Sequence, residues 1–408
     1  MNRTQPTHVV VLGGGYAGTL AALRLAGKSK RRPVTVTLVN GADHFVERIR
    51  HHQLAAGQPR RTIPFANLLA GSGVRFVQGW CTGITPTTKE LTVQTTAGVE
   101  TLTYDYLIYA LGSTVDNRRV PGVTEHAHTL ADEAAVQRLQ AQVQTLAAQQ
   151  GRLLIVGGGL TGIEAATELA ESHPGLQITL ATTGQLGATL SPAGAAHVRR
   201  VFDRLGIAVA AATTVERLTA NAAHCADGRL LSFDACLWAG SFVVPQLAAT
   251  AGLPVDSRGR LLVDETLRVV NHPAIYAAGD VAATPLRMAC ATAMPMGAYV
   301  ADQLAAQLTG QPAPGPFHFS YVLQCISLGR RNGLVQLVQA DDTPKPRIIS
   351  GWAAARVKEL ICRFTVWSLQ MEKRWPGLYA WPQAAPALPQ RPQEETKQVS
   401  YGQTAANL

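Results

Sequence analysis

Charged residues are scarce in this 408-residue chain, and so are aromatic ones. Charged side chains make up 15% of the residues and aromatic side chains 6%, against 47% hydrophobic residues. This composition excludes a mainly disordered chain, and the length predicts two or three domains. The formal net charge is +9. Because no basic block is interleaved with aromatic residues, the charge suits anionic small molecules and argues against a nucleic-acid partner.

Cysteine motifs and long apolar runs are missing as well. None of the six cysteines has C-x-x-C spacing, which argues against a metal site, a redox dithiol or a disulfide framework and indicates a reducing compartment. The uncharged run 235–255 contains Pro245 and Pro254 and would be a poor membrane helix. The apolar run at the start of the sequence is too short for a signal peptide. We therefore expect a cytoplasmic protein without a bound metal.

Two segments of the chain repeat one pattern. VVVLGGGYAG begins at Val9 and LLIVGGGLTG begins at Leu153, and each is followed by a helical pattern and a second apolar strand, at 34–39 and 176–181. This is the G-x-G-x-x-G fingerprint of a dinucleotide-binding βαβ unit, present twice. The glycines allow a tight turn, a close approach of pyrophosphate and close packing of helix on strand. The candidate loop residues are Gly13, Gly14, Gly15, Ala17 and Gly18 in the first unit and Gly157, Gly159 and Gly162 in the second.

The residues that close the second strands depart from the usual pattern. An acidic residue normally binds the ribose hydroxyls there, whereas this chain has Asn40 in the first unit and Thr182 in the second. Asn40 can still form a hydrogen bond to a ribose. The neutral Thr182 would not repel a 2′-phosphate, yet no lysine or arginine follows it at once. The choice between NADH and NADPH stays open, with a slight preference for NADH.

A third motif points to a flavin. Residues 275–281 read IYAAGDV, and residues 103–113 read TYDYLIYALGS. With the two fingerprints, these motifs make residues 8–310 resemble the flavoproteins with two dinucleotide domains, the family of glutathione reductase and the type II NADH dehydrogenases. The resemblance implies FAD at the first fingerprint and NADH or NADPH at the second. It also implies that Gly279, Asp280 and the turn from Ala110 to Gly112 contact the flavin.

The same resemblance predicts an α/β fold. We expect two Rossmann-like domains of the glutathione reductase type and a C-terminal α+β segment. The FAD domain would comprise residues 1–115 and 245–312, and the NAD(P)H domain would comprise 116–244. Residues 313–380 would form an interface or capping segment, and 381–408 a loosely ordered tail. Glu164 falls where the family places a glutamate near the nicotinamide. A solvated glutamate in the first helical turn is an equally good interpretation.

The segments that would contact the electron acceptor differ from those of type II NADH dehydrogenases. The segment 43–57 has no cysteine pair, which excludes electron exit through a dithiol. The glutamine motif of quinone-reducing members is also absent, with Cys290, Ala291 and Pro295 at its positions. Quinone reduction is therefore in doubt, and a polar or anionic acceptor is favoured.

The charged stretch ERIRHH contains Arg48, Arg50, His51 and His52. A solvated helix face is the favoured interpretation of this stretch. As a functional alternative, His51 or His52 would transfer a proton, and Arg48, before Arg50, would bind the flavin's pyrimidine edge or an anionic substrate.

The segment 353–375 predicts an amphipathic helix. Val357, Leu360, Ile361, Phe364, Trp367 and Met371 recur at helical spacing between basic residues. Such a helix either contacts a membrane surface or packs on the protein's own flavin domain or a second subunit. We favour the second interpretation, and a homodimer stays open.

The sequence thus predicts an FAD-dependent NAD(P)H oxidoreductase similar to NADH dehydrogenases, with a small-molecule electron acceptor. Two other functions stay open. One is an FAD-dependent tailoring oxidase or reductase of a specific metabolite. The other is a redox sensor without turnover, as in proteins similar to apoptosis-inducing factor.

Overall fold

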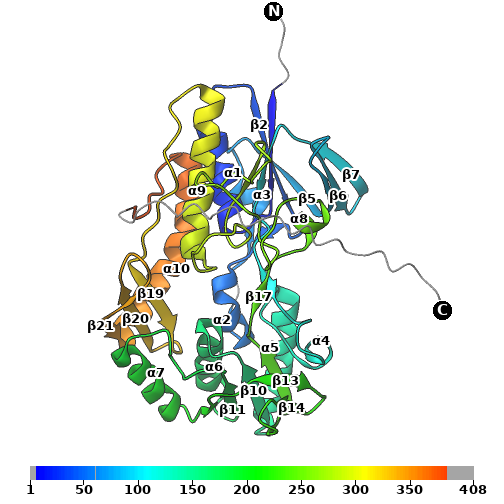
Figure 1. Cartoon of the computed structure of the whole chain (residues 1–408). Coiled ribbons are helices and arrows are strands. Elements are labelled where there is room, and N and C mark those ends of the chain that lie inside the picture. The colour runs from blue at the N-terminus through cyan, green and yellow to red at the C-terminus, as the bar shows by residue number, and fades with distance from the viewer. Residues whose placement is uncertain (1–5, 60, 384–408) are drawn as a thin grey trace, which may run out of the picture.

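The computed structural model describes residues 6–59 and 61–383. Its upper half in Figure 1 is built on a 7-stranded sheet. In spatial order the strands are β18 (Ile275–Ala277), β8 (Tyr106–Tyr109), β1 (Thr7–Leu12), β2 (Val34–Asn40), β5 (Val74–Thr85), β6 (Glu90–Thr95) and β7 (Gly98–Thr103). The strands from β18 to β5 pair in parallel, and β6 and β7 extend the sheet as an antiparallel hairpin.

The first βαβ unit forms where the glycine fingerprint predicts it. β1 pairs with β2 on one side and β8 on the other, and Val9, Val10 and Val11 are fully buried. Continuous β-branched runs of this kind are typical of parallel strands covered on both faces. Helices α1 (Tyr16–Lys28) and α9 (Cys290–Thr309) pack against each other on one side of the sheet. The predicted strand at 34–39 is confirmed as β2.

The second βαβ unit forms the lower half of the molecule. Its sheet has the order β12 (Ala208–Ala210), β11 (Gln177–Ala181), β10 (Arg152–Val156) and β16 (Ala235–Trp238), all parallel. A 3-stranded antiparallel sheet follows, with β13 (Val215–Leu218), β14 (Ala222–Cys225) and β15 (Leu230–Ser232). The helices of this half are α4 (Val123–His126), α5 (Glu133–Ala148), α6 (Leu160–Ser172) and α7 (Pro192–Arg204). The strand expected at 176–181 is confirmed as β11.

Short elements connect the two halves. β9 (Thr114–Val115) pairs with β17 (Phe242–Val243), so the chain leaves and re-enters the upper half at one place. β3 (His44–Phe45) pairs with β4 (Ile63–Pro64). Between them, the 3-10 helix η1 (Arg48–Arg50) and helix α2 (His51–Ala55) reach down to α5 and α6 (Figure 1). The remaining short helices are α3 (Phe65–Leu68) and α8 (Leu247–Thr250).

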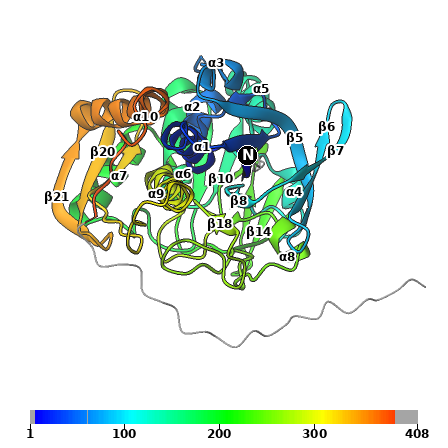
Figure 2. The same cartoon turned by 90° about the horizontal axis from the view of Figure 1, so that it is seen from above.

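The C-terminal segment forms a sheet and one long helix. β19 (Leu323–Ser327), β20 (Gly333–Val338) and β21 (Pro344–Ser350) are antiparallel, and α10 (Gly351–Arg374) returns from them to α1. In Figure 2 this segment lies on the side opposite the β6–β7 hairpin. The predicted α/β class with a C-terminal α+β segment is confirmed. The domain boundaries at 115, 245 and 312 stay a prediction, and the tail from 384 onward lies outside the described residues.

The α10 stripe does not pack on the chain's own flavin domain through its largest members, while packing on a second subunit, the other half of the same expectation, stays a prediction. Leu360, Phe364 and Trp367 are exposed, and Phe364 and Trp367 stack on each other. The buried face of α10 is another one, carrying the small or polar side chains of Ala354, Cys362, Thr365, Ser368 and Glu372 along with Val366 and Leu369. None of the helices in the described ranges combines the length and hydropathy needed to cross a bilayer.

Candidate functional site

The first glycine loop has the backbone geometry that a phosphate cradle requires. Gly13 has φ +108°, and a Cβ there would lie 2.4 Å from the Ala110 carbonyl oxygen. A Cβ on Gly18 would lie 1.9 Å from the carbonyl oxygen of Gly13, so the helix can approach the strand only with glycine there. Gly15, at the N-cap of α1, faces open space and no side chain caps the helix. The first N–H groups of α1 are therefore available to an anion.

Asn40 at the end of β2 supports this loop. Its Oδ1 accepts a hydrogen bond from the Gly14 N–H at 2.8 Å, and its Nδ2 donates to the Ala42 carbonyl at 2.9 Å. An aspartate could make the first of these contacts but not the second, because it has no donor. Asparagine therefore fixes both the loop and the turn after β2, beside the place predicted for the ribose.

Three distant segments meet around Asp280. The Ser113 hydroxyl donates to Asp280 Oδ2 at 2.6 Å, and the guanidinium of Arg48 donates to the Ser113 carbonyl. Burial raises the pKa of Asp280, while the Ser113 hydrogen bond and Arg48 act in the opposite direction. Arg48 also lies over the Phe242 ring, 5.6 Å from its centroid. The structure thus brings Arg48 beside the predicted flavin motif, as the functional alternative for this stretch requires, and its contact with a flavin stays a prediction.

Gly112 and Gly279, the neighbours of Ser113 and Asp280 in the sequence, are also predicted flavin contacts, and their backbone conformations favour glycine. Gly112 and Gly279 both have positive φ, +68° and +81°. A Cβ on Gly279 would touch the Cβ of Ala17 at 3.4 Å. A Cβ on Gly297 of α9 would lie 2.2 Å from the Ala17 carbonyl oxygen, so α1 and α9 cross in close contact.

The second glycine loop repeats the first. Gly157 has φ +123°, and a Cβ on Gly162 would again lie 1.9 Å from the carbonyl oxygen of the first glycine. Gly159 faces open space at the uncapped N-terminus of α6. The side chain of Thr182 lies against Gly158, where a Cβ would be 2.2 Å from the threonine Oγ1. Thr182 therefore takes the position that Asn40 has in the first unit.

A cation that the sequence spacing did not reveal lies near Thr182. Arg229, in the turn between β14 and β15, donates to Thr213 Oγ1 at 2.8 Å. The Thr213 N–H in turn donates to the Thr182 carbonyl at 2.8 Å. Asp227 pairs with the same guanidinium at 2.6 Å and offsets part of its charge. A positive charge therefore lies near Thr182 at this edge of the sheet, although no basic residue follows Thr182 directly in the sequence.

Glu164 is not a solvated glutamate of the first helical turn. Its side chain is only 12% exposed and pairs with Lys358 of α10 at 3.0 Å. The Ser327 N–H donates to the same carboxylate at 3.0 Å, and His52 Nδ1 lies 3.9 Å from it. Burial alone would raise the pKa of Glu164, but Lys358, His52 and Ser327 together lower it. For Lys358 burial acts downward, but Glu164, aided by Cys325 and Cys362, outweighs it and raises the pKa.

The two histidines are buried, so the favoured prediction of a solvated face is wrong for them. His51 Nδ1 contacts the Leu130 carbonyl at 2.8 Å, and burial lowers the pKa of His51. Burial, aided by Lys358, Arg330 and His51, lowers the pKa of His52 to about 4 against the attraction of Glu164. Both imidazoles are therefore neutral at pH 7. Each can accept a proton but carries none that it could donate as an imidazolium.

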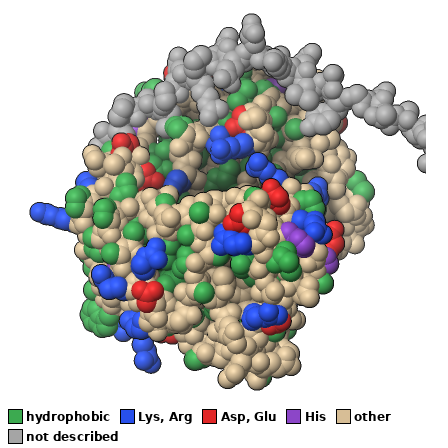
Figure 3. Space-filling model, turned by 60° about the horizontal axis from the view of Figure 1, so that its bottom comes forward, with side chains coloured by type: hydrophobic (Ala, Val, Ile, Leu, Met, Phe, Trp, Pro, Cys, Tyr) green, Lys and Arg blue, Asp and Glu red, His purple; other side chains and the backbone are tan. Residues whose placement is uncertain are grey.

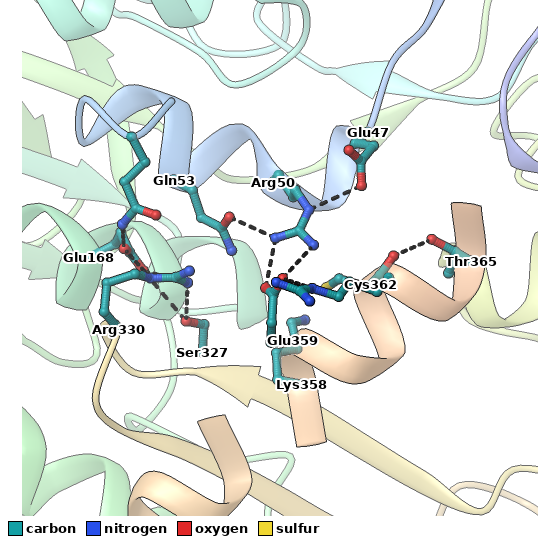
Figure 4. A network of polar contacts seen from close by, with 12 residues as sticks. Glu47, Arg50, Gln53, Glu168, Ser327, Arg330, Lys358, Glu359, Cys362 and Thr365 are labelled. Carbon is teal, nitrogen blue, oxygen red and sulfur yellow. Dashed lines mark hydrogen bonds and ion pairs between the residues drawn. The ribbon is translucent and has the colours of Figure 1, made fainter. Parts of the chain in front are cut away.

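Arg50 points away from the flavin motif, toward α10 (Figure 4). Its two Nη atoms donate to the two carboxylate oxygens of Glu359 at 2.8 and 3.1 Å. Its Nε donates to Glu47 at 3.0 Å, and Nη1 also reaches Gln53 at 3.1 Å. The two arginines of the charged stretch therefore have different surroundings. Arg48 lies beside Ser113 and Asp280, whereas Arg50 links η1 to α10 through its ion pair with Glu359.

Three thiols interact electrostatically with the Lys358 ammonium group. Burial raises the pKa of Cys290 to about 11 and that of Cys362 to about 12, and it raises the pKa of Cys325 as well. Each of these thiols is therefore protonated at neutral pH and is a poor nucleophile. Cys290 begins α9, and Pro295 lies inside that helix.

Among the described residues, three of the buried polar atoms that lack a partner belong to the first glycine-loop helix and to the charged stretch. The Tyr16 hydroxyl and the Nε2 atoms of His51 and His52 are buried and make no hydrogen bond within the described part of the chain. Because buried polar atoms are nearly always satisfied, a polar group is expected beside them. A flavin, with its ring carbonyls and nitrogens, fits that requirement. Figure 3 shows a hollow in one face of the molecule, with basic and acidic side chains at its rim.

Sequence comparison agrees with this geometry. The family model of the pyridine nucleotide-disulphide oxidoreductases matches residues 7–303, well over half of the chain. The chain belongs to this family. It is an oxidoreductase similar to NAD(P)H dehydrogenases. It is 28% identical over 336 residues to an NADH dehydrogenase-like protein of Mycobacterium tuberculosis, covering 75% of this chain and 82% of the relative. It is 27% identical over 388 residues to a demethylphylloquinone reductase of Synechocystis, covering 89% and 93%.

Solved structures show the same fold. The sulfide:quinone oxidoreductase of Aquifex aeolicus superposes with a TM-score of 0.77 at 20% identity, over 90% of this chain and 92% of the other. NDH2 of Plasmodium falciparum in complex with NADH also gives 0.77, at 16% identity, over 91% and 99%. Both likenesses extend through the C-terminal segment, beyond the part that the family model covers.

Sequence reasoning missed four residues of this oxidoreductase's candidate site, namely Ser113, Arg229, Ser327 and Lys358. Ser113 directly follows Gly112, so the signal was present but was not used. Lys358 belongs to the helix predicted at 353–375, where it was counted only as a flanking basic residue. No spacing in the sequence shows that it would meet Glu164, 194 positions earlier in the numbering.

Proposed function

We propose that this oxidoreductase binds FAD at the first glycine loop and NADH or NADPH at the second. The observation that supports this most is the repeated geometry of the two loops. In both, a Cβ on the third glycine would lie 1.9 Å from the first glycine's carbonyl oxygen, and the helix N-cap faces open space. Each helix then presents free N–H groups and its positive end to a pyrophosphate.

The described residues suggest how the chain would hold the cofactors. Asn40 supports the loop beside the adenosine ribose, and Asp280 with Ser113 offers a carboxylate and a hydroxyl to the polar part of the flavin. Arg48 adds a positive charge at the same place. When bound, FAD takes a hydride from the nicotinamide and passes two electrons to an acceptor. The protein contributes alignment and electrostatics.

We propose that the Lys358–Glu164 pair forms the polar centre of the place where the acceptor binds, in contrast to the role near the nicotinamide that the family resemblance implies for Glu164. The ammonium group is buried, so its charge acts through a medium of low dielectric constant. Glu164 offsets part of this charge, and the remainder favours an acceptor that gains negative charge on reduction. His52, neutral and beside Glu164, can accept a proton but cannot supply one at pH 7.

For the acceptor we propose a quinone as the first candidate. A relative named demethylphylloquinone reductase covers 89% of this chain. The charged stretch at 47–52 no longer opposes a quinone, because Arg50 is neutralised by Glu359 and Glu47. A polar metabolite is the second candidate, since Cys290 and Pro295 replace the glutamines of quinone-reducing members.

Steady-state oxidation of NADH and NADPH against water-soluble quinones, ferricyanide, oxygen and polar carbonyl compounds tests the acceptor. The proposal expects the highest kcat/KM with a quinone. Turnover with a polar compound alone supports the second candidate. Slow reoxidation by every acceptor, with a long-lived reduced flavin, contradicts both and favours a redox sensor.

We also propose that the exposed stripe of α10 contacts a membrane surface. Leu360, Phe364 and Trp367 form its apolar part, and Arg363 lies among them. Aromatic residues beside basic ones are typical of helices that lie in the interface of an anionic bilayer. A second subunit covering the stripe is the alternative.

A further inference from the structure

Trp80 is the most exposed tryptophan among the large hydrophobic side chains of the described residues, with 72% of its surface accessible. It lies on β5, two residues beyond Gln78, which is paired with Asn40 at the end of β2. An indole so exposed gains little from burial in the fold. We propose that Trp80 stacks on the adenine of FAD. This inference rests on the proposed function, because it assumes that FAD binds at the first loop.

The position of Gly41 shows where the indole lies. A Cβ on Gly41 would be 2.4 Å from Trp80 Cε2 and 2.6 Å from Cζ2. The ring therefore lies directly against the backbone of the residue that follows Asn40, and any larger residue at 41 would displace it. The Gln78 amide also reaches the Gly41 carbonyl, at 3.4 Å.

The side chains on this face of β5 connect Trp80 to the phosphate loop. Residues 76, 78 and 80 point to one face of the strand, since side chains alternate. Phe76 packs on Phe65, with ring centroids 4.9 Å apart, and the tip of Phe65 lies where a Cβ of Gly14 would be, at 2.6 Å. The indole is thus on the same face of the sheet as the glycine loop.

The order of binding groups then matches the order of groups in the cofactor. In a dinucleotide fold the pyrophosphate lies at the loop after the first strand, and the ribose lies at the end of the second. Here these are the Gly13–Gly18 loop and Asn40, and the adenine follows on the side of β5. A flat, exposed indole at this position offers a stacking surface that any adenine dinucleotide could use.

Binding of FAD to apoprotein tests the proposal, with Trp80→Ala, Trp80→Phe and the control Trp352→Ala. Trp352 is 69% exposed at the start of α10, so it matches Trp80 in exposure but lies outside the FAD site. Trp80→Ala should weaken FAD binding about 5- to 150-fold, the range expected for one base–aromatic stack. Trp80→Phe should retain most of the affinity, and Trp352→Ala should match the wild type.

Probes that contain only part of FAD locate the effect. FMN has no adenine, so its affinity should be equal in wild type and Trp80→Ala. ADP should change the tryptophan emission of wild type and Trp352→Phe but not of Trp80→Phe. Equal FAD affinity of wild type and Trp80→Ala, with both folded by circular dichroism, would overturn the stacking proposal alone. If wild-type apoprotein binds no FAD, the proposed function itself fails.

Discussion

His52 links the candidate site to the pH dependence of stability. Its ring is buried beside Glu164, and burial lowers its pKa to about 4 in the folded protein, against about 6.5 for an exposed histidine. Between these values the unfolded chain binds more protons than the folded one. The contribution of His52 is therefore complete above pH 6.5 and is lost as the pH falls toward 4.

We accordingly predict that His52→Gln flattens the acid side of the stability curve. Between pH 6.5 and 4.5 the wild type should lose up to ~3 kcal/mol more unfolding free energy than the variant. Urea denaturation across this range measures the difference. The other buried histidines act equally in both proteins, so their effect cancels. Parallel curves would show that His52 does not titrate as its burial requires.

Thr182 is the single side chain at which we expect the choice between NADH and NADPH to be decided. A carboxylate there would repel the 2′-phosphate of NADPH, and Thr182 has none. We predict that Thr182→Asp lowers kcat/KM for NADPH relative to NADH by about tenfold, equal to ~1.4 kcal/mol. Thr182→Ser should leave the ratio unchanged. An unchanged ratio in the aspartate variant would place the adenosine ribose elsewhere.

At the scale of elements, a buried ionic group joins α10 to α1. Arg24 is 1% exposed, and its Nε donates to Glu372 at 2.6 Å. Asp302 of α9 accepts from the same guanidinium at 3.1 Å, and Lys28 pairs with Asp302 nearer the surface. Through these contacts the helix that carries the first glycine loop is held by the C-terminal segment.

Removing the buried Arg24–Glu372 pair should lower the unfolding free energy much more than removing the partly exposed Lys28–Asp302 pair. Arg24→Met leaves the Glu372 carboxylate buried without its partner, and we predict a loss of ~3–5 kcal/mol in unfolding free energy. Lys28→Met removes a partly exposed pair and should cost at most ~1 kcal/mol. Chemical denaturation measures both. Equal costs for the two variants would mean that the buried pair does not anchor α10.

The sequence predicts the helices and strands whose own residues show a periodic pattern or a glycine motif. It does not predict which side chains become buried by contact with distant segments. The strands and helices at the two glycine loops follow from periodicity and from the steric needs of Gly13 and Gly157. The burial of His51 and His52 did not follow, because it depends on α6 and α10 covering a short charged stretch. In α10 the large apolar residues predicted the helix correctly but not its buried face, which small and polar side chains form instead.

At the scale of the whole molecule, the proposed membrane contact rests on the exposed stripe of α10, which comprises Leu360, Phe364 and Trp367. We predict that the double substitution Phe364→Ser with Trp367→Ser weakens binding to anionic vesicles at least tenfold, equal to about 1.4 kcal/mol of lost apolar contact. Leu230→Ser, an exposed site on β15, is the control and should bind as the wild type does. Vesicle sedimentation measures both.

Sedimentation velocity separates the membrane from a second subunit. If the wild type is a dimer in solution and the double variant is a monomer, with vesicle binding unchanged, the stripe is a subunit interface. The membrane proposal then fails, while the account of the cofactor sites is unaffected.

The two glycine loops, with Asp280 and Arg48 beside the first, imply that nicotinamide reduces a flavin inside this fold. Anaerobic mixing of the FAD-loaded protein with NADH or NADPH measures this step without any acceptor. The account predicts loss of the flavin's visible absorbance with at least one of the two, and no loss in Gly162→Val, where the added side chain would collide with Gly157. A flavin that stays oxidised with both nucleotides would contradict it.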